Sequence, residues 1–210
     1  MRYEILCVAI SAMAGSALAG VVVAETNWNS GGLEGWTFDN NGGGVWNYEA
    51  AGGNGGGYIQ YVDDVDGTIS PPPIFAPAEF LGDYTGYVGG YLEYDIILNG
   101  IATLPGEPTN YLRMRLEGAN GSEARIIADY DIDSTWQTVR VNIVESEWEM
   151  ISGTWADLIS NVTAMRTGGD LITGFGPEGG LDNVRLVVPE APFAGLIMFG
   201  AMSSIRRRRS

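Results

Sequence analysis

Short segments in which apolar and polar residues alternate recur along the chain, and no other feature narrows the possible folds as much. Successive side chains of a β-strand point to opposite faces, so each segment has one apolar face and one polar face. The apolar members are Leu92, Tyr94 and Ile96; Leu112, Met114 and Leu116; Val139, Val141 and Ile143; and Val184 and Leu186. We expect antiparallel sheets with one buried face, and solvent exposure for the polar members Glu93 and Asp95.

Clusters of Gly, Asn, Asp and Pro separate these segments. They lie at residues 40–44, 52–57, 71–73, 104–108 and 118–121. Such residues adopt or fix the backbone angles of tight turns, so we expect loops between the strands there. Trp46 and Tyr48 interrupt the glycine-rich stretch, which predicts a strand between two loops.

One segment has helical spacing instead. Within residues 154–165, Trp155, Leu158, Ile159 and Val162 recur at intervals of three and four, and Thr154 can cap the first turn. We therefore expect one short helix packed over an end of the sheets. Together the segments predict an all-β protein, an antiparallel jelly-roll β-sandwich with one short helix.

The residue inventory limits both the stabilising bonds and the chemistry. Cys7 is the only cysteine and lies in an N-terminal apolar segment, so no disulfide bond can form within the remaining chain. The absence of histidine and lysine excludes Ser-His and Cys-His nucleophiles, ordinary zinc sites and Schiff bases. Carboxylate pairs and oxygen-ligated calcium remain. We expect no catalytic residues and no enzymatic activity.

The charge of the chain is strongly acidic. Between Gly20 and Pro189 the sequence has 24 acidic side chains and six arginines. Phosphate binding needs a basic surface, so we expect no nucleic-acid partner. The same charge favours solubility and opposes contact of the domain with anionic membranes.

Residues 1–19 have the layout of a secretory signal peptide. Arg2 precedes an apolar stretch, and Ala17-Leu18-Ala19 is an A-x-A cleavage site before Gly20. Ala17 and Ala19 are therefore the predicted cleavage residues, and the protein is expected to be exported. A second cleavage site at residues 22–24 and a retained N-terminal anchor are the alternatives.

The other end of the sequence has three parts: Val188-Pro189-Glu190, an uncharged apolar run at 191–205, and Arg206–Arg209. As a helix the run would be about 22 Å long, which is short for a hydrocarbon core of about 30 Å. Consecutive arginines resist translocation, so we expect the domain outside and the arginines inside the cytoplasmic membrane. An ordinary tail anchor, or a last strand followed by a basic end, is the alternative.

This three-part end resembles the PEP-CTERM sorting signal of Gram-negative bacteria. The resemblance implies that an exosortase-type enzyme processes the tail and that the protein accompanies extracellular polysaccharide. Val188, Pro189 and Glu190 would be the sorting motif, and Arg206, Arg207, Arg208 and Arg209 the membrane stop. The expected organisation is a signal peptide at 1–19, one domain at 20–187 and a sorting tail with a C-terminal apolar helix at 188–210.

Three stretches of the domain resemble laminin B (laminin IV type A) domains. They are residues 32–36, which resemble the opening of those domains, residues 75–94, which contain the central motif, and residues 180–186, which resemble their ending. The resemblance implies an extracellular structural or adhesive module. It also implies a structural calcium near Asp182, because related jelly rolls place one beside the last strand.

Aspartates are the expected metal ligands, because Ca²⁺ prefers hard oxygen donors. Besides Asp182, the candidates are Asp63, Asp64 and Asp66, and Asp129, Asp131 and Asp133. The alternative is that these are solvated turn residues, with Asp182 capping a turn. None of these segments has the EF-hand pattern.

Three functions remain open. The first is a structural protein of the cell surface or extracellular matrix, associated with exopolysaccharide, and the second is a carbohydrate-binding module. The third is a glycosidase that uses only carboxylates. An exposed aromatic row on a sheet would favour the binding module, and two facing carboxyl groups about 5–9 Å apart would favour the enzyme. The sequence does not separate exposed from core rings among Trp46, Tyr48, Tyr58, Tyr84, Trp136, Trp148 and Trp155.

Overall fold

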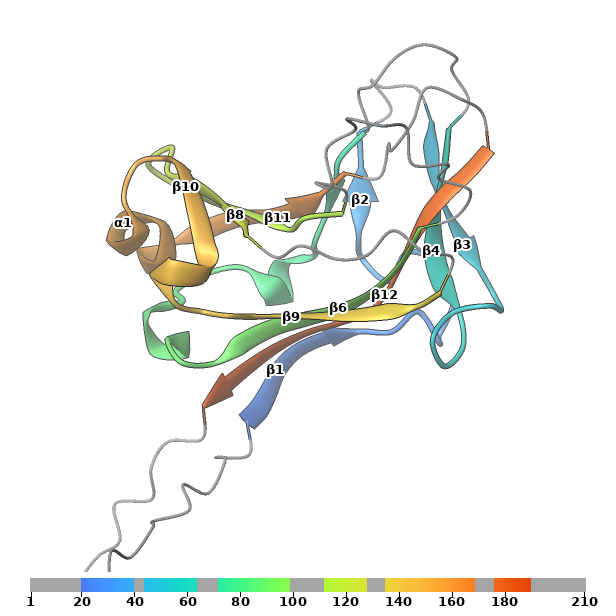
Figure 1. Cartoon of the computed structure of the whole chain (residues 1–210), viewed down its shortest axis with the longest axis horizontal. Helices are drawn as coiled ribbons and strands as arrows, with labels where there is room; N and C mark the ends of the chain where they lie inside the picture. Colours follow the sequence, from blue (N-terminus) through green and yellow to red (C-terminus); the bar gives the residue numbers. More distant parts are fainter. Residues whose placement is uncertain are drawn as a thin grey trace, which may run out of the picture.

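The computed structural model describes residues 20–39, 44–63, 72–98, 112–127, 135–168 and 176–189. These residues form two antiparallel β-sheets that pack face to face, with one short α-helix at an end (Figure 1). In chain order the elements are β1 (Gly20–Thr26), β2 (Thr37–Phe38), β3 (Val45–Glu49), β4 (Tyr58–Asp63), β5 (Ile74–Phe75), η1 (Ala78–Phe80), η2 (Thr85–Tyr87), β6 (Tyr91–Leu98), β7 (Arg115–Gly118), β8 (Glu123–Ile126), β9 (Gln137–Asn142), η3 (Glu145–Glu147), β10 (Trp148–Ser152), α1 (Trp155–Ser160), β11 (Val162–Thr167) and β12 (Gly176–Pro189).

The chain passes back and forth between the two sheets, which confirms the predicted jelly-roll β-sandwich. Sheet A has the strand order β3-β4-β12-β6-β9, and β1 also pairs with β12. Sheet B has the order β10-β8-β7-β11-β5-β2. With 14 residues, β12 is long enough to pair with β4 through its first half, with β1 through its second half, and with β6 on its other edge.

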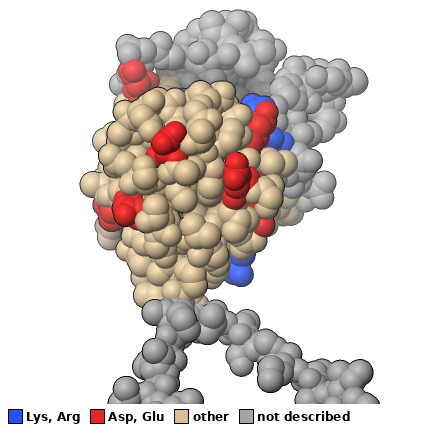
Figure 2. All heavy atoms as spheres, turned by 90° about the vertical axis from the view of Figure 1, so that its left-hand side faces the viewer, with Lys and Arg blue, Asp and Glu red and all other residues tan. Residues whose placement is uncertain are grey.

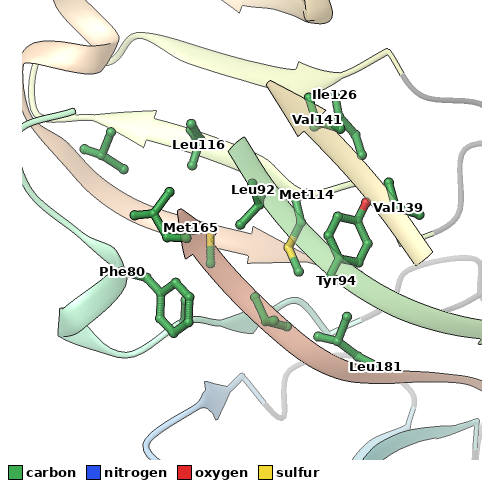
Figure 3. Close-up of a cluster of buried hydrophobic side chains, with 14 of the residues drawn as sticks. Phe80, Leu92, Tyr94, Met114, Leu116, Ile126, Val139, Val141, Met165 and Leu181 are labelled. Carbon is green, nitrogen blue, oxygen red and sulfur yellow. The ribbon is translucent and has the colours of Figure 1, made fainter. Parts of the chain in front are cut away.

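The core lies between the inner faces of the two sheets (Figure 3). The apolar members of every predicted alternating segment are buried in it, as expected. Side chains of sheet A meet those of sheet B there, joined by Phe80 of η1 and by Met114, which precedes β7. The labelled residues are Phe80, Leu92, Tyr94, Met114, Leu116, Ile126, Val139, Val141, Met165 and Leu181. This burial supplies the main stabilisation of the described part, since each large apolar side chain contributes about 1.5–3 kcal/mol when fully buried.

The predicted helix forms, but it is shorter than expected. Thr154 caps it, with its hydroxyl accepting a hydrogen bond from the Asp157 N–H at 3.2 Å. The prediction that Val162 continues the helix is wrong. Val162 begins β11, because it exchanges two main-chain hydrogen bonds of 2.8 Å with Gly82.

A second difference concerns the segment around Leu112. Leu112 and Met114 are buried as predicted, but β7 begins only at Arg115. Leu112 has a φ of 54°, a left-handed conformation that a strand cannot contain. The chain therefore turns at Leu112 before it enters the sheet.

The first and last described residues lie side by side. Gly20 of β1 is the cross-strand partner of Pro189 of β12, and Val21 is the partner of Val188. Figure 1 shows these strand ends together at one end of the molecule. Val188 and Pro189 of the predicted sorting motif thus belong to the sheet. Ala17, Ala19, Glu190 and Arg206–Arg209 lie outside the described residues, and among the described helices none is long and apolar enough to cross a membrane.

Candidate functional site

Polar and aromatic side chains gather on the outer face of sheet A, the face turned away from sheet B. On β6, Tyr91, Glu93 and Asp95 alternate with the core residues, so they point outward. Their cross-strand partners on β9 are Asn142, Arg140 and Thr138, respectively. Because β9 is the edge strand of sheet A, these pairs form a row along one border of the outer face.

Glu93 is not exposed, contrary to the prediction. Its side chain is 7% exposed, and its carboxylate accepts hydrogen bonds from Arg140 Nε at 2.6 Å and Arg185 Nη2 at 2.8 Å. Two guanidinium groups therefore replace the water that a carboxylate needs. Arg140 also lies 4.1 Å above the ring of Tyr91, and its side chain remains 55% exposed.

Asp95 is also buried, and the prediction of exposure is wrong for it too. It is 4% exposed, and its carboxylate accepts hydrogen bonds from Thr138 Oγ1 at 2.5 Å, Asn54 Nδ2 at 2.9 Å and Asn183 Nδ2 at 2.7 Å. Asn54 belongs to the loop between β3 and β4. That loop reaches across the sheet and covers the carboxylate, while the Asn54 carbonyl accepts a hydrogen bond from Asn183 at 2.8 Å.

Asp182 is the cross-strand partner of Asp95 and is 1% exposed. Burial raises the pKa of Asp182 to about 6, hydrogen bonds from the Asn183 and Asn54 main-chain N–H groups oppose this shift, and the charges of Asp95 and Glu34 add to it. The two facing carboxylates are both covered, so they offer no open cleft to a substrate.

Oxygen atoms converge beside Asp182. A methyl group placed on Gly53 would lie 2.5 Å from the Gly57 carbonyl oxygen, 2.7 Å from Asp182 Oδ2 and 2.9 Å from the Gly56 carbonyl oxygen. These are the hard donors that Ca²⁺ prefers. The described residues contain no group of three or more His, Cys, Asp or Glu side chains that could hold a metal, so carbonyl oxygens would have to complete a calcium site here.

The side chains of the other predicted calcium ligands lie outside the description. Asp63 is the last residue of β4, and its side chain is outside the description. Asp64, Asp66, Asp129, Asp131 and Asp133 lie outside the described residues.

An aromatic pair stands at one end of the row on β9. Trp136, just before β9, meets Tyr58 of β4 with 5.3 Å between ring centroids and 86° between ring planes. Trp136 Nε1 donates a hydrogen bond to the Gly52 carbonyl at 2.8 Å. Tyr58 lies against Gly180, where a methyl group would come within 2.8 Å of its ring. Three contacts thus fix the position of the pair: the contact between the rings, the hydrogen bond to Gly52 and the packing of Tyr58 on Gly180.

Trp136 differs from the other tryptophans of the chain in being half-buried. Among the other aromatic residues, Trp28, Trp36, Trp46, Tyr58, Phe80, Tyr84, Trp148 and Trp155 are buried, and Phe38, Tyr48 and Phe75 are half-buried. No local sequence signal separates Trp136 from the buried rings, because its neighbours in space come from distant segments.

We define the outer strip as Trp136, Thr138, Arg140 and Asn142. Its ends are six positions apart along the strand, which corresponds to about 20 Å. Beside it, a groove of about 210 Å³ is lined by Arg140, Ile127, Val141, Ser146 and Glu147. The strip offers an aromatic ring, a hydroxyl, a guanidinium group and an amide in a line. Thr138, Arg140 and Asn142 already donate to Asp95, Glu93 and Glu147, respectively. A linear ligand could therefore combine ring stacking with hydrogen bonds to the remaining donor and acceptor positions of these exposed side chains.

The outer face of sheet B has a different character. Its charged side chains pair with each other, as Arg115 with Glu123, Arg125 with Glu149, and Arg166 with Glu117 and Glu123. The charged groups on sheet B therefore neutralise each other. The outer face of sheet A is the better candidate for a binding site, because an aromatic pair adjoins its polar row.

No protein-family model and no curated protein matches the sequence. Among solved structures, the family 11 carbohydrate-binding module from Clostridium thermocellum in complex with a β-1,3-1,4-mixed-linked tetrasaccharide aligns with a TM-score of 0.52 and 17% identity, over 83% of this chain and 98% of that chain. The same family 11 module of the cellulosomal cellulase Lic26A-Cel5E gives 0.51 and 16%, over 82% and 96%. The L4b domain of human laminin α2 gives 0.48 and 13%, over 57% and 71%. At such identities the family 11 modules share the β-sandwich fold with this chain.

Proposed function

We propose that this protein is a glycan-binding module that holds a neutral polysaccharide along the outer strip. The observation that carries the proposal is Trp136, a half-buried tryptophan held edge-on against Tyr58 at the end of a polar row. A sugar ring has an apolar C–H face, which packs on an aromatic ring, and hydroxyl groups, which need donors and acceptors. The outer strip supplies both.

The solved structures of similar fold support the same function. Several are carbohydrate-binding modules, and one of them contains a bound tetrasaccharide. This support favours glycan binding over the purely structural role that the sequence placed first. It gives no reason to prefer one glycan over another.

The charge of the protein favours a neutral ligand. A formal net charge of −15 repels acidic polysaccharides at low ionic strength. Within the site, Glu93 is neutralised by two arginines and Asp95 is covered by three donors. Specificity would then arise from hydrogen bonds to sugar hydroxyls rather than from charge.

We also propose that the module works outside the cytoplasmic membrane, close to exopolysaccharide. The support is the sequence of the two ends, which resembles a signal peptide and a PEP-CTERM tail processed by an exosortase-type enzyme. Mass spectrometry of the surface-exposed protein should find residues 1–19 and Arg206–Arg209 missing. A full-length chain recovered from the cytoplasm would contradict this proposal.

A structural calcium beside Asp182 completes the proposal. The Asp182 carboxylate and the carbonyl oxygens of Gly56 and Gly57 would hold it, and the ion would fix the loop that supplies Asn54 to the site. Calcium would thus act on the order of the loop and have no part in contacting the sugar.

Affinity electrophoresis tests the main function. The mature protein is run through gels that contain mixed-linkage β-glucan, xylan or mannan, and through gels that contain alginate or polygalacturonate. We expect retardation by at least one neutral polysaccharide and by neither acidic one. Retardation by none would favour the purely structural role, and release of reducing sugar would favour a glycosidase.

A further inference from the structure

Exposed apolar side chains cluster at one end of the molecule. The exposed large apolar residues of the described part are Val21, Val22, Val23, Val88, Ile127 and Ile151. The three consecutive valines belong to β1, and Val88 lies close to the same place. A methyl group on the neighbouring Gly89 would be 3.8 Å from the Pro189 ring. We call Val21, Val22, Val23 and Val88 the apolar pole.

The apolar pole surrounds the point where β1 and β12 end. Val21 is the cross-strand partner of Val188, and Val22 of Val187. A groove of about 190 Å³ beside the pole is lined by Gly20, Gly89, Gly90, Tyr91, Val188 and Pro189. Tyr91, which lines the groove, is half-buried, so apolar and amphipathic side chains share this end of the molecule.

The charge distribution sets this end apart. Figure 2 shows acidic side chains over the upper part of one face, and none on the lower part of that face, next to the end where β1 and β12 stop. Exposed Glu25 lies on β1 two residues after Val23, and Glu190 follows Pro189 in the sequence, so the low acidic charge holds for that face alone. In a protein with a net charge of −15, that face of the end can approach a membrane surface with less repulsion than the rest of the domain.

An apolar segment follows this end of the molecule in the sequence. An uncharged apolar run begins at residue 191, two residues after Pro189. Two residues span at most about 7 Å. Wherever that run enters a bilayer, the apolar pole must therefore lie close to the bilayer surface.

We propose that, before the tail is processed, the apolar pole rests on the surface of a lipid bilayer while the run at 191–205 anchors the chain in it. The valines enter the interfacial layer, and Tyr91 lies at the level of the headgroups, where such rings are favoured. Since Tyr91 adjoins the pole and Trp136 lies at the opposite end of the outer strip, the strip then points away from the membrane. This inference is independent of which glycan binds.

Single cysteine probes test the proposal, because removal of the predicted signal peptide at 1–19 also removes Cys7, the only native cysteine. The chain from Gly20 to Ser210, with Val22→Cys or Val88→Cys, is labelled with an environment-sensitive fluorophore and reconstituted into phosphatidylcholine vesicles that contain nitroxide lipids. The matched control is Ile151→Cys, equally exposed but on sheet B. We expect quenching at positions 22 and 88 to be at least twofold stronger than at position 151.

Two outcomes would overturn the proposal. Equal quenching at all three positions, or no quenching at 22 and 88, would mean that the pole does not contact lipid. A fluorescence change at position 22 that depends on protein concentration, and occurs without nitroxide, would instead show that β1 pairs with a second copy. Val21→Cys gives an independent probe of the same strand if the label at position 22 disturbs the fold.

Discussion

Trp136 meets Tyr58 edge to face, with ring centroids 5.3 Å apart and ring planes at 86°. Tyr58 is in turn held against Gly180 of β12, and the Trp136 indole donates to Gly52 of the β3–β4 loop. The exposed part of the indole therefore has one orientation before any ligand arrives. Such preorganisation lowers the entropy that binding must overcome.

Replacing Trp136 by alanine should weaken polysaccharide binding at least tenfold, which corresponds to about 1.4 kcal/mol. Trp136→Phe keeps a ring and should retain most of the affinity. Phe75→Ala is the matched control, since Phe75 is a half-buried ring on sheet B. Titration calorimetry measures all three. An unchanged affinity in Trp136→Ala would place the binding site elsewhere.

Glu93→Gln should destabilise the fold by about 1–3 kcal/mol, because it removes the charge that holds two guanidinium groups at the sheet. Glu149→Gln is the control. Glu149 also pairs with an arginine, but its side chain is 49% exposed, so water screens the pair and the loss should be clearly smaller than for Glu93→Gln. Urea denaturation of the two variants gives the comparison, and equal losses would show that Glu93 has no special role.

Asp182 should make stability depend on pH in the acid range. Its folded-state pKa of about 6 lies above the ordinary value of 3.8, so the folded state favours the protonated form. Its contribution is therefore greatest below about pH 4 and is lost as the pH rises to about 6, by an amount on the order of 1–2 kcal/mol. Thermal melts between pH 4 and 7 should show this loss in the wild type and not in Asp182→Asn.

Calcium should restore the stability that is lost when Asp182 ionises. A cation beside the ionised carboxylate would remove the cost of burying its charge, so calcium should raise the melting temperature at pH 7 and a chelator should lower it. Asp182→Asn should respond to neither. A wild-type melting temperature that is identical with calcium and with chelator would contradict the calcium proposal and leave the pH effect intact.

Gly90→Ala should destabilise the sandwich by about 1–3 kcal/mol. The added methyl group would lie 2.1 Å from the Val187 carbonyl oxygen and 2.9 Å from Val188 Cα, so the main chain itself must shift. Gly86→Ala is the control, because nothing lies within 4 Å of a methyl group there. Chemical denaturation should separate the two variants, and a loss of the same size in both would contradict the packing argument.

The core could be predicted from the sequence because burial in a two-sided sheet follows a local rule. Leu92, Tyr94 and Ile96 are buried wherever β6 is placed, as long as one face of its sheet is covered. A different local rule, helical spacing, gave a wrong prediction at Val162. The spacing continued to Val162, but the hydrogen bonds to Gly82 placed this residue in a strand. Tertiary contacts overrode a weak local preference there.

The candidate site could not be predicted in the same way. Glu93 and Asp95 looked solvated, yet the groups that cover them include Arg140, 47 residues from Glu93, and Asn183, 88 residues from Asp95. Trp136 looked like any other aromatic residue, and its partner Gly52 is 84 residues away. Only the pairing of distant strands decides which carboxylates are covered and which ring stays at the surface.

The pairing of Gly20 with Pro189 has a consequence for how this fold can be combined with others. Cross-strand Cα atoms are about 5 Å apart, so the polypeptide enters and leaves the sandwich at nearly one point. A domain with adjacent chain ends can be inserted into a surface loop of another protein without separating the two ends of that loop. It would then be attached to the other protein at one place only.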